Sequence, residues 1–228
     1  MSSVVPPWVP AGTAALAGKA TALAGAARTG LVLVGDDRGE LALWDAEGRP
    51  LRGFRMPDPI VSVAASADGR RRGAVDAEGR VRVVDEAGEV VFDLVVPGTT
   101  ILRTTAVGDC WHLVDPLRGR VEVRNVHGHP IQTFEVPQEI AGYALDEAEG
   151  APTLVTRAGL VVHFTPWGRQ AWAKDFGSAA GDLAADSKGS LLAVALQQRG
   201  VACLLPGGGV PFGDIAPGFP VGAVALAE

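Results

Sequence analysis

The chain has 228 residues, of which 47% are hydrophobic and 20% charged, and its formal net charge is −6 at pH 7. This composition supplies enough apolar material for a large folded domain and excludes an intrinsically disordered chain. The negative charge argues against nucleic acid or an anionic membrane surface as the main partner, and no run reaches the roughly 18 apolar residues that a membrane span needs.

The 30 Gly and 16 Pro residues favour many short strands joined by tight turns. The two cysteines, Cys110 and Cys203, lie in apolar strand patterns, so we expect two buried free thiols and no disulfide framework. Residues 11–27 are rich in Ala, Leu and Gly, but no basic region precedes them and Lys19 interrupts them, unlike a secretory signal. We therefore expect a soluble cytoplasmic protein without membrane insertion.

Residues 1–19 precede the repeating part of the chain and are predicted to form an N-terminal strand or arm, with an edge strand near Val4–Val9. A period of about 40 residues then divides the chain within one domain, 1–228. The expected repeats are 20–59, 60–98, 99–139, 140–179 and 180–220, followed by a terminal inner strand at 221–228.

Each repeat predicts four short strands. They are expected at 20–25, 30–34, 40–44 and 50–54; 61–65, 71–75, 80–84 and 90–94; 100–105, 110–114, 120–124 and 131–134; 141–145, 153–156, 160–164 and 170–173; 181–185, 191–195, 201–205 and, weakly, 211–215.

Turn glycines recur in register between these strands. The columns are Gly30, Gly69, Gly108, Gly150 and Gly189; Gly39, Gly79, Gly119, Gly159 and Gly200; and Gly48, Gly88, Gly128, Gly168 and Gly208. A fourth column follows the outer strands, at Pro57, Pro97, Pro137, Gly177 and Pro217. Several turns have an Asp-x-x-Gly pattern, in which Asp caps the backbone and Gly accepts a positive φ.

A period of about 40 residues with four strands each is typical of β-propeller blades. The segments GDDRGELALWD, ending at Trp44-Asp45, and VDAEGRVRVVD, ending at Val84-Asp85, resemble WD40 blades, whereas Trp167-Gly168 and Trp172 resemble the quinoprotein-like blade. No Gly-His dipeptide opens a blade, and only the first repeat has Trp at the Trp-Asp position. The resemblance covers residues 20–228, implies an all-β propeller of four-stranded blades, and implies no catalytic residue.

The segment Val221–Ala227 matches the first strand of a blade. The chain therefore has six predicted first strands but only five sets of outer strands. We favour five complete blades and an incomplete sixth, with one or two strands from residues 1–19 beside 221–227. A five-bladed ring with an extra terminal strand is the alternative. An unfinished blade leaves backbone groups unpaired and invites strand addition from a partner.

The turns between second and third strands share one face of a propeller with the connections between repeats. Polar and aromatic side chains at these loop tips are typical of a protein-binding surface, with ordinary solvated turns as the alternative. The predicted interaction residues are Asp37, Arg38, Glu78, Arg118, Gln138, Arg157, Arg199 and Phe219. Calcium could bind the acidic turns with Asp36 and Asp76, but turn capping also accounts for these residues.

The histidines indicate no catalytic or metal site. His127 and His129 flank a turn glycine without further ligands nearby, and His112 and His163 lie in strands, where we expect packed or hydrogen-bonded side chains. No nucleophile elbow, P-loop or dinucleotide fingerprint occurs. We therefore assign no catalytic residue, no cofactor and no metal.

The working hypothesis is a non-enzymatic scaffold or accessory subunit whose partner is another protein subunit. The alternative is a propeller that binds a small molecule or metal, or a hydrolase or lyase that uses the axial channel. That alternative requires polar side chains on the innermost strands, where only Arg103, Tyr143 and Asp182 stand out.

Overall fold

The computed structural model describes residues 16–26, 28–146, 150–186, 189–211, 213–215 and 218–226. Within these ranges the chain forms nineteen β-strands, grouped in five antiparallel sheets. We number the sheets 1 to 5 in chain order. The all-β class and the repeated four-stranded sheets are as the sequence predicts.

The strands follow the predicted repeats, four to a sheet except in sheet 5. Sheet 1 contains β1 (Ala20–Ala26), β2 (Leu31–Asp36), β3 (Glu40–Trp44) and β4 (Pro50–Arg55); sheet 2 contains β5 (Ile60–Ala65), β6 (Arg72–Asp76), β7 (Arg80–Val84) and β8 (Val90–Val95). Sheet 3 contains β9 (Ile101–Thr104), β10 (Cys110–Asp115), β11 (Arg120–Asn125) and β12 (Pro130–Glu135); sheet 4 contains β13 (Ile140–Leu145), β14 (Pro152–Thr156), β15 (Leu160–Phe164) and β16 (Gln170–Asp175). Sheet 5 contains β17 (Ala180–Ala185), β18 (Leu192–Leu196) and β19 (Gly200–Leu204).

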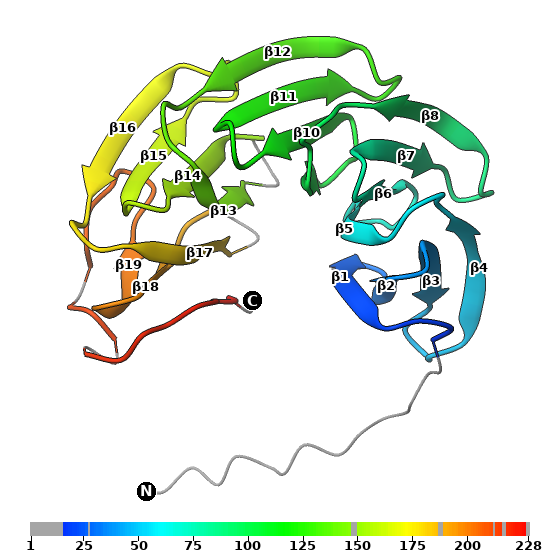
Figure 1. Ribbon diagram of the computed structural model, residues 1–228, viewed down its shortest axis with the longest axis horizontal. Helices are drawn as coiled ribbons and strands as arrows, with labels where there is room; N and C mark the ends of the chain where they lie inside the picture. The colour runs from blue at the N-terminus through cyan, green and yellow to red at the C-terminus, as the bar shows by residue number, and fades with distance from the viewer. Residues whose placement is uncertain are drawn as a thin grey trace, which may run out of the picture.

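The five sheets lie side by side around a common centre, with the first strand of each sheet innermost and the fourth strand at the rim (Figure 1). The first strands contact one another in sequence, β1 with β5, β5 with β9, β9 with β13, and β13 with β17. The arc in Figure 1 is open between sheet 1 and the C-terminal segment, so β1 and β17 do not meet.

The core is divided into four layers, one between each pair of neighbouring sheets. Leu33 and Leu41 of sheet 1 pack with Val63 of sheet 2, and the other three clusters join sheets 2 and 3, 3 and 4, and 4 and 5. A sheet with two apolar faces needs a neighbour on each side. This arrangement explains why sheets 2, 3 and 4 each contribute buried apolar side chains to two clusters.

The turn glycines of all three predicted columns have positive φ, as the sequence predicts. Gly39 shows why the position requires glycine, because its φ is 80° and an added Cβ would lie 2.5 Å from the carbonyl oxygen of Met56. The turns therefore fix both the hairpin geometry and the close approach of the following loop.

Aspartates cap these turns in the way that the Asp-x-x-Gly pattern predicts. Asp76 is fully buried, and its Oδ1 accepts hydrogen bonds from the backbone N–H groups of Glu78 (3.1 Å) and Arg80 (2.9 Å). Asp85 makes the same two bonds, to Ala87 and Glu89 (both 2.9 Å), in a turn that is largely exposed.

Replacing Asp76 tests the value of a buried cap. We expect Asp76→Ala to lower the free energy of unfolding by about 2 kcal/mol, because two backbone donors lose a charged acceptor that water cannot replace. Asp85→Ala is the matched control and should cost less, since solvent reaches that turn. Urea denaturation of both variants makes the comparison, and equal losses would contradict it.

Sheet 5 departs from the prediction at its outer edge. Among the described residues of the expected strand at 211–215, one bridge forms, between Val201 and Ile215. The expected inner strand at 221–227 is not paired in a ladder either, although its described residues run beside β17, where a Cβ on Gly181 would lie 2.7 Å from the carbonyl oxygen of Gly222. In each of the five sheets the first strand pairs with the second strand of its own sheet, and the described residues supply no such second strand for 221–226. The predicted strand near Val4–Val9 lies outside the described residues.

Candidate functional site

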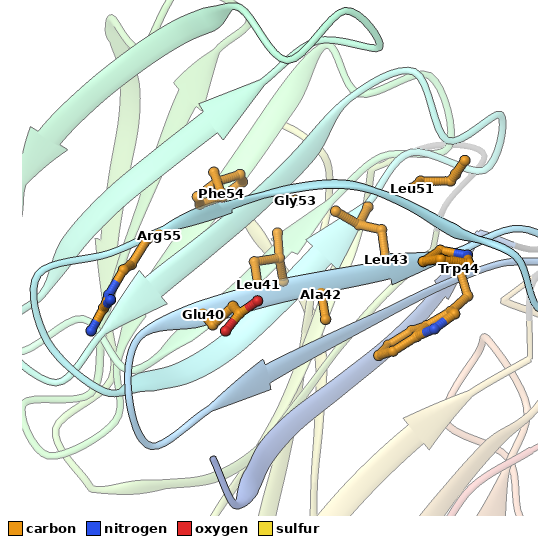
Figure 2. Close-up of a pocket in the computed structure, with 10 residues that line it drawn as sticks. Glu40, Leu41, Ala42, Leu43, Trp44, Leu51, Gly53, Phe54 and Arg55 are labelled. Carbon is orange, nitrogen blue, oxygen red and sulfur yellow. The ribbon is translucent and has the colours of Figure 1, made fainter. Parts of the chain in front are cut away.

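One face of sheet 1 is turned away from sheet 2, towards the open part of the arc. Cross-strand partners share a face, and the pairs Leu23 with Val34, Val34 with Ala42, and Val32 with Trp44 place these five residues together. The alternate residues of the same strands pack in the core with sheet 2. We call Leu23, Val32, Val34, Ala42 and Trp44 the open face. Figure 2 shows Ala42 and Trp44 on one side of β3 and Leu41 and Leu43 on the other.

The next repeat provides an internal comparison for the open face. Val63, Ala74 and Val84 occupy the corresponding positions of sheet 2, forty residues later, and are only 4%, 0% and 4% exposed, with Val63 and Ala74 packed in the layer next to sheet 1. By contrast, Leu23 is 72% exposed and Val32 is 38% exposed. The open face therefore has the chemistry of a covered surface, and no described residue covers it. Burying Leu23 alone would contribute about 2 kcal/mol.

A groove of about 550 Å³ lies on the outer half of this face, between β3 and β4 (Figure 2). It exists because sheet 1 has Ala42 and Gly53 where sheet 2 has Arg82 and Asp93, which form an ion pair at 2.6 Å. Arg82 also donates to the carbonyl oxygen of Arg55 at 2.9 Å and so ties sheet 2 to sheet 1. The lining residues are Glu40, Leu41, Ala42, Leu43, Trp44, Pro50, Leu51, Gly53, Phe54 and Arg55.

The groove has a polar end and an apolar end. Glu40 and Arg55 face each other across β3 and β4 at one end (Figure 2), and Trp44 and Pro50 do so at the other. Gly53 is required in its floor, because an added Cβ would lie 1.8 Å from the carbonyl oxygen of Leu41. The arrangement suits an inserted side chain whose body is apolar and whose tip is polar.

The structure places the eight predicted interaction residues at exposed positions, on turns and connections at one end of the sheets. They are Asp37, Arg38, Glu78, Arg118, Gln138, Arg157, Arg199 and Phe219. Several are tied down locally. Arg157 pairs with Glu139 at 2.7 Å, and Arg199 pairs with Asp214 at 2.7 Å and lies over the ring of Phe176. Exposed ion pairs of this kind contribute little to stability.

The polar residues of the innermost strands come together, as the axial alternative requires. Arg103 of β9, Tyr143 of β13 and Asp182 of β17 line one cavity of about 300 Å³, together with the C-terminal residues 224–226. His112 of β10 does not line this cavity, but it contacts one of its residues, Tyr143. His112 is 3% exposed, and its Nδ1 lies 2.6 Å from the Tyr143 hydroxyl, which makes it the packed, hydrogen-bonded histidine expected. Burial lowers the pKa of His112 to about 4.

The remaining candidates have structural roles. His163 contacts Thr153 at 2.8 Å and stacks on Trp172, while His127 and His129 lie exposed on a turn whose backbone N–H groups Asn125 caps. Both cysteines are free thiols, and Cys203 is buried as predicted, but Cys110 is only half-buried, so the expectation of two buried thiols is wrong there. Within the described ranges no group of His, Cys, Asp and Glu is arranged to hold a metal ion.

The open face was not among the predicted sites. A comparison of Ala42 and Gly53 with Arg82 and Asp93 in the aligned repeats is the sequence signal that would have found its groove.

The part of the chain that the structure describes contains no helix long and apolar enough to cross a membrane. No protein-family model matches the chain, and no curated protein matches it either.

Proposed function

We propose that this protein is a β-propeller with a sixth position that its described sheets leave unfilled, and that it is a non-enzymatic scaffold for another protein. The observation that supports this most is the open face, where Leu23 is 72% exposed although its counterpart Val63 is 4% exposed. The partner inserts a β-structured element between sheet 1 and the C-terminal segment.

The radial arrangement of the sheets supports the propeller. Each sheet presents its first strand to the centre and buries apolar side chains against the next sheet (Figure 1). A propeller buries both faces of every blade only when the ring is filled. Sheet 1 has one face buried and one face exposed, so a further sheet-like element completes the pattern.

The chemistry of the open face defines the partner. An element with one apolar face would cover Leu23, Val32 and Trp44, and a side chain with a polar tip would enter the groove and meet Glu40 and Arg55. Two or three strands with alternating apolar and polar residues have these properties. The free thiols Cys110 and Cys203 fit a reducing compartment, and we place the protein in the cytoplasm.

Site-specific photo-cross-linking tests this function. A photoreactive residue at position 23 in the native host should capture one discrete protein, and a photoreactive residue at Val90, which is 55% exposed on the rim strand β8, should not. Val32→Asp should weaken the complex about tenfold or more, because it buries an unpaired charge at the interface. Val95→Asp on the exposed rim is the matched control and should leave the complex intact.

Three outcomes would overturn the proposal. They are a cross-link from position 23 that reaches only residues 1–15 of the same chain, a complex that survives Val32→Asp, and a complex that Arg118→Ala or Arg157→Ala abolishes while Val32→Asp does not. The last outcome would assign the binding to the loop tips.

A further inference from the structure

A second site lies at the centre of the arc, away from the open face. The cavity of about 300 Å³ lies where β9, β13 and β17 approach the C-terminal segment, and its walls combine four polar side chains, those of Arg103, Thr104, Tyr143 and Asp182, with small or apolar ones. The apolar wall consists of Ala144, Leu145, Leu183, Ala184, Ala185, Val224, Ala225 and Leu226. It is formed by three different sheets, so the folded arrangement alone assembles it.

Arg103 is the polar group in this cavity with the most unused hydrogen-bonding capacity. Its guanidinium has five N–H donors, and its hydrogen bond among the described residues is from Nη1 to the carbonyl oxygen of Leu102, at 2.9 Å. No described carboxylate forms an ion pair with Arg103, in contrast to Arg82, which pairs with Asp93 at 2.6 Å. Burial lowers the pKa of Arg103, while the nearby charge of Asp182 opposes that shift and favours the cation.

The other three polar groups are already engaged by the protein, and among them the Thr104 hydroxyl donates to the carbonyl oxygen of Cys110 at 2.9 Å. Asp182 accepts hydrogen bonds from the backbone N–H groups of Leu183 (2.8 Å) and Val224 (3.3 Å), and the Tyr143 hydroxyl lies 2.6 Å from His112 Nδ1. Asp182 is near Arg103 but forms no direct ion pair with it, so an anion bound at the unused N–H donors of this largely desolvated guanidinium would be favoured. The negative charge of Asp182 nearby disfavours a second negative charge on that ligand.

We propose that this axial cavity binds a short-chain monocarboxylate, with the carboxylate on the Arg103 guanidinium and the hydrocarbon chain against the apolar wall. A volume of about 300 Å³ corresponds to roughly ten water molecules at about 30 Å³ each, which accommodates an acid of a few carbons. This site requires no partner protein and does not rest on the function proposed above. No bond is made or broken.

Calorimetric titration of the full chain with butyrate tests the site. Butyrate should bind saturably, and butyramide, a neutral molecule of the same shape, should bind about 10- to 100-fold more weakly because it cannot form the charge-assisted bond. Butylammonium should not bind. Arg103→Gln should weaken butyrate by the same factor, and Arg118→Gln, on an exposed loop, should not change it.

The comparison of butyrate with butyramide on the unchanged chain decides the proposal even if Arg103→Gln does not fold. Arg103→Lys, which keeps the charge, should then retain measurable butyrate binding. Equal binding of butyrate and butyramide, no saturable binding of butyrate, or unchanged affinity in Arg103→Gln would each overturn it.

Discussion

Trp111→Ala is expected to lower the free energy of unfolding by about 3–5 kcal/mol, the range for removal of a fully buried large aromatic side chain. Trp111 is 0% exposed in the layer between sheets 2 and 3, where its ring and that of Phe92 form a T-shaped pair at a centroid distance of 6.1 Å. Gly73 provides the space for the indole, since an added Cβ there would lie 2.7 Å from Cζ3 of Trp111. Close-packed surroundings of this kind cannot collapse into the space that the variant leaves.

Trp111→Phe separates packing from hydrogen bonding. The indole Nε1 of Trp111 is buried and has no hydrogen-bond partner among the described residues, so the phenyl ring removes an unsatisfied donor as well as volume. We expect this variant to lose roughly 1–2 kcal/mol. Trp167 is 82% exposed, so Trp167→Ala is the control that measures how much stability is lost when a tryptophan outside the core is removed. Chemical denaturation followed by circular dichroism compares the three, and a Trp111→Ala loss no larger than that of Trp167→Ala would contradict the layered core.

Acidification is expected to remove about 3 kcal/mol of stability through His112. Its folded pKa is about 4 because the ring is buried, and the ordinary value is 6.5. At neutral pH the imidazole is uncharged in both states. Between pH 6.5 and about 4 the unfolded chain binds a proton that the folded chain does not, so stability falls as the pH falls. The whole difference corresponds to about 3 kcal/mol, of which about 2 kcal/mol is lost by pH 5.

Denaturant midpoints measured at neutral pH and near pH 5 isolate this contribution. His112→Gln should show a smaller acid-induced loss than the unchanged chain, whatever its stability at neutral pH. His127→Gln removes a histidine from an exposed turn and should keep the full loss. If His112→Gln and His127→Gln respond to acid alike, a buried neutral His112 is not the cause.

The strands and turns were predictable because their determinants are local. Gly39 must accept a φ of 80°, and its column recurs every 40 residues, so the sequence alone locates the hairpins. The segment 221–227 resembles the first-strand segment Val61–Ser66 in its small and apolar residues, yet its described residues form no ladder. Pairing depends on a second strand beside it, and no local pattern contains that information.

The site was harder to predict for the same reason. Leu23 and Val63 occupy one position of the repeat and are both apolar, but one is 72% exposed and the other 4% exposed. They differ in exposure because sheet 1 covers Val63, whereas no described sheet covers Leu23. The charged loop tips, such as Arg118 and Arg157, were found from sequence because turns are exposed in any arrangement of the sheets. The convergence of Arg103, Tyr143 and Asp182 was partly foreseen, since all three lie on first strands.

The most direct test of the open face as a docking surface is the rate at which a thiol reagent modifies a Leu23→Cys variant. In the purified chain the reaction should be as fast as that of Val90→Cys on the exposed rim. In the native assembly the thiol at position 23 should be strongly protected, while the thiol at position 90 stays reactive. Protection of position 23 in the purified chain, or equal reactivity of both positions in the assembly, would contradict the account.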